Sequence, residues 1–179
     1  MGLDMYIFRV WEINAQYRTK ADQITGSIDI SEGDKKLPID FSRLDEITEE
    51  VAYWRKANHI HRWFVENVQG GKDDCNRYEV DIEQLKELRD LCAEVLDKAV
   101  IVDSEDPTQG KVIQNVDEIK ELLPTSPGFF FGSMEYGPWY IWDTEGTVEK
   151  LDKILEEDAK IKALGIGSST CTYEYMASW

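Results

Sequence analysis

The amino-acid sequence predicts an α+β fold, in which a small antiparallel sheet has three main helices packed on it. Two observations lead to this fold class. Segments rich in β-branched and aromatic residues lie near the two ends of the chain, at 3–13 and 169–178, and are predicted to be strands. Between them, longer segments repeat their apolar residues every three or four positions, as amphipathic helices do. The 179 residues suit a single domain, 1–179, with a polar insertion at about 102–115.

The two terminal strands are predicted to be neighbours in one sheet. Residues 3–13 are apolar on both faces, which indicates a buried strand, and residues 169–178 alternate. Left unpaired, an edge of this composition would invite aggregation, so we expect 3–10 to pair with 170–177. Residues 15–40 mix turn residues with the short alternating run SIDIS and predict a loop or an edge hairpin.

The first long helix is predicted over residues 44–68. On a helical wheel, with about 100° between successive residues, the apolar side chains share one broad arc and the charged ones gather opposite. The wheel places His61 inside the apolar arc and His59 among the charged residues, so His61 is predicted to be buried and His59 to be exposed. The arc consists of Tyr53, Trp54, Ala57, Ile60, Phe64, Val65 and Val68.

Two more main helices follow, with two short elements between them. Residues 81–100 form an amphipathic pattern, and 147–161 form the third long helix. Residues 102–114 are a polar, hairpin-like excursion, and 116–124 predict a short helix that ends at Pro124. The core side of the 81–100 helix consists of Ile82, Leu85, Leu88, Cys92, Val95 and Leu96.

Composition excludes several classes of function. The net charge of −16 argues against binding of nucleic-acid phosphates, which needs a basic surface. No apolar window is long enough to span a bilayer, and the first residues have no signal-peptide pattern. Three cysteines without a Cys-x-x-Cys pair predict reduced thiols in a cytoplasm and no metal site. We therefore expect no membrane, metal or cofactor.

His61 and Cys75 are the candidates for catalysis. A buried histidine needs a hydrogen-bond partner, so His61 is either a satisfied core residue or a general base or ligand donor beside Asn58. Cys75 follows Asp73 and Asp74 in a turn, where adjacent carboxylates disfavour the thiolate. A Cys75–His61 pair is conceivable, but no cysteine-hydrolase motif accompanies it.

The segment SPGFFFGSMEYGPWYIWD at 126–143 is unusually aromatic. Three successive rings cannot share one face of a strand, so the phenylalanines are predicted to fill the core as a buried strand or tight connector. The polar tips of Tyr136, Trp139 and Tyr140 could rim a cleft. Gly132 and Ser133 could hold a phosphate on backbone amides, although the pattern is less specific than a P-loop. The pocket candidates are therefore Arg55, Asn58, His61, Ser133 and Tyr136.

An acidic stripe is predicted on the 81–100 helix. Five carboxylates recur at spacings of four and three residues, on the side opposite the apolar one. Such a row is either a solvated helix face or a surface that competes for the basic groove of a DNA-binding protein. The stripe consists of Glu83, Glu87, Asp90, Glu94 and Asp97.

Three segments carry a resemblance to a known family. They are MGLDMY at 1–6, VAYWRKANHIHRWFVENVQ at 51–69 with DDC at 73–75, and ELLPTSPGFFFGSMEY at 121–136. In these the sequence resembles a group of small proteins of bacteriophages, prophages and other mobile elements. That family often has an aspartate after the tyrosine, where this chain has Gly137 and Pro138. The resemblance implies a mobile-element origin and the cytoplasm of a bacterial host, but no chemistry.

Two functions follow as expectations. The first is a non-enzymatic phage or mobile-element accessory protein that binds a host protein with a basic face through the acidic stripe. An inhibitor of a defence nuclease, in the manner of an anti-CRISPR protein, would be one example. The alternative is a protein that binds a small ligand or nucleotide, or an enzyme, with its pocket near His61 and the FFFGS segment.

Overall fold

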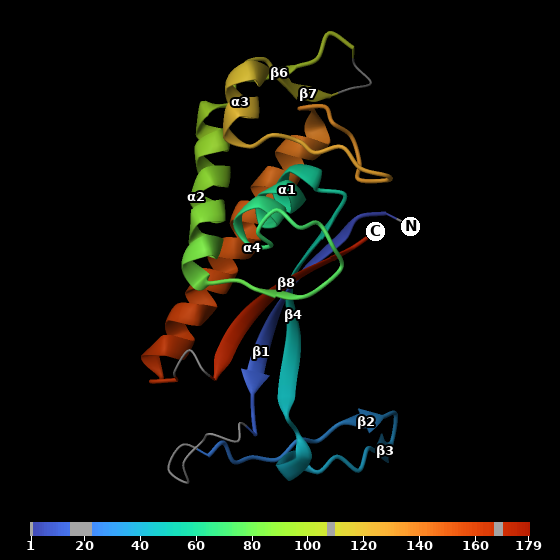
Figure 1. Ribbon diagram of the computed structural model, residues 1–179, viewed down its shortest axis with the longest axis vertical. Helices are drawn as coiled ribbons and strands as arrows, with labels where there is room; N and C mark the ends of the chain where they lie inside the picture. The colour runs from blue at the N-terminus through green and yellow to red at the C-terminus, as the bar shows by residue number, and fades with distance from the viewer. Residues whose placement is uncertain (1, 15–22, 107–109, 167–169) are drawn as a thin grey trace.

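The computed structural model describes residues 2–14, 23–106, 110–166 and 170–179, and within them the predicted α+β class is confirmed. The main sheet has the strand order β4-β1-β8-β5 and is antiparallel. The first and last strands pair as predicted: Asp4 lies opposite Ser178, and Trp11 lies opposite Cys171. The two ends of the chain therefore lie close together (Figure 1). The strands are β1 (Asp4–Glu12), β4 (Glu46–Arg55), β5 (Tyr78–Glu79) and β8 (Cys171–Ser178).

One face of this sheet is buried against helices. Met5 and Ile7 of β1 are fully buried, as are Tyr175 and Ala177 of β8. These side chains share a face because successive residues of a strand point to opposite sides. The opposite face is only partly covered, and there the rings of Tyr6 and Phe8 stack 5.7 Å apart.

Four helices accompany the sheet. Figure 1 shows α2 (Ile82–Lys98) and α4 (Pro138–Ala163) running side by side. At one end of the molecule lie α3 (Val116–Leu122) and the hairpin of β6 (Ile101–Asp103) and β7 (Lys111–Ile113), and at the other end lies the hairpin of β2 (Ser31–Glu32) and β3 (Lys35–Lys36). The short α1 contacts both the sheet and α4, because Phe64 stacks on Tyr175 and His59 contacts Thr144. The helices are α1 (Asn58–Asn67), α2 (Ile82–Lys98), α3 (Val116–Leu122) and α4 (Pro138–Ala163).

The predicted helix over 44–68 is wrong in its first half. Residues Glu46–Arg55 form β4, and the chain turns at Lys56, whose φ is 63°, before α1 begins. Ile47, Thr48, Val51, Tyr53 and Trp54 are β-branched or aromatic and favour a strand. Pairing with β1 along the whole of β4 satisfies its backbone, which a helical wheel does not consider.

The same error misplaced His59. The wheel predicted an exposed side chain, but His59 is only 3% exposed, while His61, at 1%, is buried as predicted. Almost every side of α1 is covered, because it contacts the sheet, α4 and the 125–133 segment. A helix enclosed in this way has no single solvent face.

Most of the remaining elements agree with the sequence. The helix at 81–100 is α2, with Cys92 in the core, and the short helix at 116–124 is α3. The hairpin-like segment at 102–114 contains β6 (Ile101–Asp103) and β7 (Lys111–Ile113), although 107–109 lie outside the described residues. The third helix starts earlier than predicted, at Pro138, where proline suits the first turn.

The segment predicted as a loop or edge hairpin, 15–40, is described only from residue 23. It contains the two-residue strands β2 (Ser31–Glu32) and β3 (Lys35–Lys36), which pair antiparallel and are exposed. The 3-10 turn η1 (Phe41–Arg43) then leads into β4. Residues 15–22 lie outside the described part of the chain.

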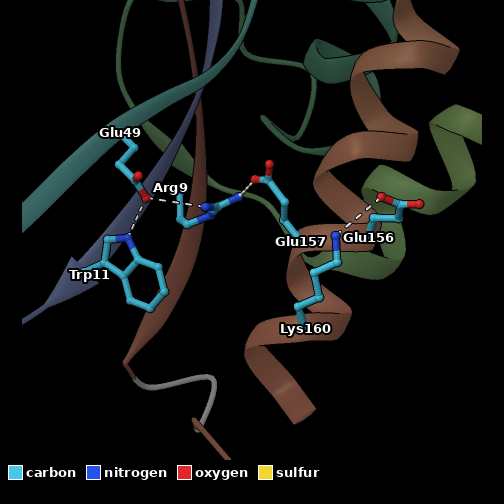
Figure 2. A network of polar contacts seen from close by, with 6 residues as sticks. All are labelled: Arg9, Trp11, Glu49, Glu156, Glu157 and Lys160. Atoms are coloured by element: carbon cyan, nitrogen blue, oxygen red, sulfur yellow. Dashed lines mark hydrogen bonds and ion pairs between the residues drawn. The ribbon is translucent and has the colours of Figure 1, made fainter. Parts of the chain in front are cut away.

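A buried arginine ties the sheet to α4. Arg9 of β1 donates from Nη1 to Glu49 Oε2 of β4 at 3.4 Å and from Nη2 to Glu157 Oε2 of α4 (Figure 2). Glu49 Oε2 also accepts from Trp11 Nε1 at 2.6 Å. Two carboxylates from different elements thus compensate a guanidinium whose side chain is only 8% exposed.

Candidate functional site

A pocket of about 620 Å³ lies where the β4–α1 turn, the 132–135 segment and the first turns of α4 meet. Its volume is within the usual range for a small-molecule site. Charged, aromatic and small polar side chains together form its wall. They are Arg55, Lys56, Asn58, His59, Gly132, Ser133, Glu135, Trp139, Tyr140, Trp142 and Asp143.

The backbone around this pocket is strained. Among the described residues, Lys56 and Phe130 are the only non-glycine residues with positive φ, at 63° and 64°. Gly132 has φ 101°, and a Cβ there would lie 2.7 Å from the carbonyl oxygen of Lys56. Positive φ in a residue with a side chain costs free energy and occurs often at functional sites. The pocket therefore depends on a close approach between two segments that only glycine permits at position 132.

Asn58 holds these two segments together. Its Nδ2 donates to the carbonyl oxygens of Phe131 and Ser133, at 3.2 and 2.8 Å, and its Oδ1 accepts from Ser126 N at 3.1 Å. Both Nδ2 hydrogens are used in this way. Asn58 is therefore a positioning residue, rather than a free ligand donor beside His61.

His59 forms part of the pocket wall in a defined tautomer. Thr144 Oγ1 donates its hydrogen to the carbonyl oxygen of Tyr140 at 2.7 Å and must therefore accept from His59 Nε2, 3.2 Å away. The His59 ring also lies 4.2 Å from the ring of Tyr140. Burial lowers the pKa of His59 to about 3, so the ring is neutral near pH 7.

Asp143 adds a half-buried carboxylate. Within the described part of the chain its side chain makes no hydrogen bond or close ion pair; the nearest opposite charge that affects it is Lys150. Burial raises the pKa of Asp143 to about 6, and the Coulombic attraction of Lys150 opposes this. A carboxylate with its hydrogen-bonding capacity unused is available to a ligand.

Two tryptophans that line the same pocket are largely exposed to solvent. Trp139 is 71% exposed and Trp142 is 63% exposed, although tryptophan is normally well buried. Their rings lie 6.2 Å apart in an edge-on arrangement. Two cations line the same pocket. Lys56 has no ion-pair partner among the residues described, and Arg55 has only a contact with Asp4 at 3.9 Å. The pocket thus combines ring surfaces with two cations and two carboxylates, Glu135 and Asp143.

The predicted pocket residues fall into two groups. Arg55, Asn58 and Ser133 line the pocket, but His61 and Tyr136 do not. Tyr136 instead accepts a hydrogen bond from Thr125 N at 3.2 Å and packs 4.7 Å from Tyr140. Lys56, His59, Glu135, Trp142 and Asp143 also line the pocket but were not among the predicted residues. The i, i+3 and i, i+4 spacing of Trp139, Trp142 and Asp143 on one helix could have indicated the last two.

His61 lies in a separate buried network. Its Nδ1 is 2.7 Å from Tyr175 OH and its Nε2 is 3.1 Å from Asp73 Oδ1. Because a carboxylate only accepts, Nε2 carries the hydrogen and Nδ1 accepts from the tyrosine. Burial lowers the pKa of His61, although the charge of Asp73 opposes this. Both nitrogens are used, and this geometry matches a satisfied core histidine.

Within the described residues, Cys75 makes no hydrogen bond to His61 or to its partners. It is an exposed free thiol, while His61 takes its partners from Asp73 and Tyr175. Within the described ranges, no three His, Cys, Asp or Glu side chains are grouped to hold a metal ion.

The FFFGS segment is only partly in the core. Phe131 is 5% exposed, but Phe129 and Phe130 are 78% and 50% exposed, so the prediction that all three fill the core is wrong. The segment has no regular strand, and its rings point to different surroundings. Ser133 Oγ accepts from Glu135 N at 3.1 Å, which leaves its hydroxyl hydrogen free to donate toward the pocket.

The acidic stripe on α2 is exposed but partly neutralised. All five carboxylates are exposed. Asp90 pairs with Lys86 at 2.9 Å and with Arg89 at 3.1 Å, and Glu94 pairs with Lys98 at 2.6 Å. Only Glu83, Glu87 and Asp97 of the stripe make no ion pair within the described structure.

Comparison of the chain with protein-family models, curated proteins and solved structures finds no match. None of the helices that the structure describes has the length and apolar character needed to cross a membrane.

Proposed function

We propose that this protein binds a small ligand that has a flat ring and an anionic group, with nucleotides as the ligand class. One observation carries the proposal: two exposed tryptophans and two cationic side chains meet at a single pocket of about 620 Å³. Arg55 and Lys56 supply the cations.

The tryptophans support a ring-stacking site. A ring inserted beside Trp139 or Trp142 would cover surface that is now in water, and stacking of a base on an aromatic side chain contributes about 1–3 kcal/mol. The anionic group would then lie near Arg55 and Lys56. Lys56 has no competing partner in the described structure, so little would have to break for it to bind a phosphate.

Loss of both rings is the direct test. Replacing Trp139 and Trp142 by alanine together is expected to weaken nucleotide binding about 100-fold, or about 2.7 kcal/mol, because both stacking surfaces are lost. Isothermal titration calorimetry with GMP, AMP and UMP measures the affinity, and circular dichroism verifies the fold.

The matched control is Trp11→Phe, which changes a tryptophan on β1 outside the pocket. It should bind as the parent does, and binding should also quench the tryptophan fluorescence of the parent and this control. If none of the three nucleotides binds the parent protein, the proposal is refuted.

A second candidate is the accessory protein that binds a basic host protein through α2, in the cytoplasm of a bacterial host. Exposure of all five stripe carboxylates supports it. Ion pairs at Asp90 and Glu94 weaken it, because a paired carboxylate contributes less to the field that attracts a basic partner. The unpaired Glu83, Glu87 and Asp97 would be the main contributors.

Reversal of these three charges tests the second candidate. The Glu83→Lys, Glu87→Lys, Asp97→Lys variant changes the local charge by about six units and should abolish capture of a basic protein from bacterial lysate. Helicity should survive, because the Asp90 and Glu94 ion pairs remain and lysine favours helices about as well as glutamate.

The control for this reversal carries the same charge change at Glu50, Glu121 and Glu149, which are exposed carboxylates on other elements. Quantitative mass spectrometry compares what each variant retains at low and high salt. Equal retention by both variants and the parent would leave the stripe as an ordinary solvated face.

A further inference from the structure

Two of the side chains that α1 and α4 present to the pocket, His59 and Asp143, have acceptor atoms without a hydrogen-bond donor among the described residues. His59 Nε2 carries the ring hydrogen, so Nδ1 has a free lone pair. Nδ1 makes no hydrogen bond within the described structure, and it is not one of the three buried side-chain atoms without a partner, which are Arg9 Nε, Gln69 Oε1 and Tyr173 OH. His59 lines the pocket, although the residue is only 3% exposed.

Asp143 supplies the second acceptor. It precedes Thr144, which accepts a hydrogen bond from His59, so the same turn of α4 carries Asp143 and the residue that orients His59. Its oxygens have no hydrogen-bond donor among the described residues. A ligand that covers these acceptors must supply hydrogen-bond donors to them, because an acceptor buried without a donor costs free energy.

The cations of the pocket come from a different element. Arg55 is the last residue of β4 and Lys56 lies in the turn after it, while His59 and Asp143 belong to helices. A ligand that binds both the cations and the acceptors carries N–H donors on its ring and an anionic group elsewhere.

We infer that the pocket selects a guanine ring over an adenine ring, with Asp143 as the residue that reads the ring edge. Guanine carries N1–H and an exocyclic amine side by side, and the two can donate to the two oxygens of one carboxylate. Adenine offers an amine beside an acceptor nitrogen, which would face the carboxylate lone pairs. This inference rests on the proposed function, since it requires that the pocket takes a nucleotide.

A site built around hydrogen bonds strongly rejects an analogue that lacks the matching donor, because its own buried groups are then left unpaired. Asp143 is half-buried, so the discrimination should be smaller than in a closed site. We expect GMP to bind about 10- to 100-fold more tightly than AMP. IMP, which keeps N1–H but lacks the exocyclic amine, should fall between them.

The experiment is calorimetric titration of GMP, IMP and AMP into the full chain and into its Asp143→Asn variant. The variant replaces one acceptor oxygen by a donor, so it should lose the preference for GMP while retaining weak binding of all three nucleotides. Glu149→Gln is the matched control, because it removes an exposed carboxylate from the same helix outside the pocket. The control should keep the parent preference.

The outcomes distinguish a preference for guanine from nucleotide binding itself. Equal affinity for GMP and AMP would overturn the guanine inference and leave the nucleotide site standing. A GMP preference that survives Asp143→Asn would overturn the role of Asp143. If no nucleotide binds, the guanine preference and the nucleotide site are both refuted. Should the variant fail to fold, the comparison of GMP, IMP and AMP on the parent protein decides the ring preference alone.

Discussion

Lowering the pH from 7 to 5 is expected to reduce the free energy of unfolding by about 2 kcal/mol through His59 alone. In the folded protein, burial lowers the pKa of His59 to about 3. In the unfolded chain the same ring takes up a proton near pH 6.5. Between these two values the unfolded state binds more protons, so stability falls as the pH falls, by about 1.4 kcal/mol per pH unit.

Other groups also change the free energy of unfolding in this pH range, and their contributions differ in sign. The pKa of His61 is also lowered by burial, so His61 adds to the acid destabilisation. The pKa of Asp143 is raised to about 6 by burial, so its folded form takes up a proton first and opposes the loss. The His59 contribution must therefore be measured as a difference between two proteins.

The measurement is urea-induced unfolding at pH 7, 6 and 5 for the parent and for His59→Gln. Glutamine cannot be protonated, so the drop between pH 7 and pH 5 should be about 2 kcal/mol smaller in the variant. His61→Gln is a second comparison, and it should also lose less stability than the parent between pH 7 and pH 5. If the parent and His59→Gln lost equal stability over this range, a buried neutral His59 would be contradicted.

Removing both carboxylates around Arg9 is expected to destabilise the fold by about 3 kcal/mol. In the Glu49→Gln, Glu157→Gln variant, the guanidinium stays buried without a counter-charge. Breaking a buried ion pair from one side costs about 3–5 kcal/mol, and we expect the low end because both glutamates are partly exposed. Urea unfolding at pH 7 measures the loss.

Arg9→Met should behave differently. It removes the charge that needs compensation and keeps an unbranched side chain, so the cost is expected to be below about 1 kcal/mol. Glu156→Gln is the matched control, since Glu156 is the neighbour of Glu157 on α4 and makes only an exposed contact with Lys160 at 3.6 Å (Figure 2). A double-glutamine variant as stable as this control would show that Arg9 does not need its carboxylates.

Some features of this protein follow from local sequence pattern. The terminal strands and α2 were predictable because each has a strong periodicity. The burial of His61 and Cys92 was also correct. At these sites the neighbours in sequence and the neighbours in space favour the same structure.

The candidate site was only partly predictable. Arg55, Asn58 and Ser133 were chosen because the 51–69 and 126–143 segments both have unusual composition, and the structure places all three in the wall of one pocket. His61 was wrongly assigned to the pocket, and His59 was missed, because they differ by two positions and the predicted wheel put them on opposite sides. The helix was assumed to start at 44, whereas α1 begins at Asn58 and is covered by several elements.

The sequence by itself determined the α+β class, the pairing of its two ends and the amphipathic helices, because these depend on patterns within a segment. The tertiary structure alone decided that 46–55 is a strand, that Phe129 and Phe130 are exposed and that His59 and Asp143 share a pocket. Each of these outcomes depends on contacts between residues far apart in the chain. Backbone pairing with β1 and coverage of α1 by three other segments outweigh the local preferences that a single-segment pattern reports.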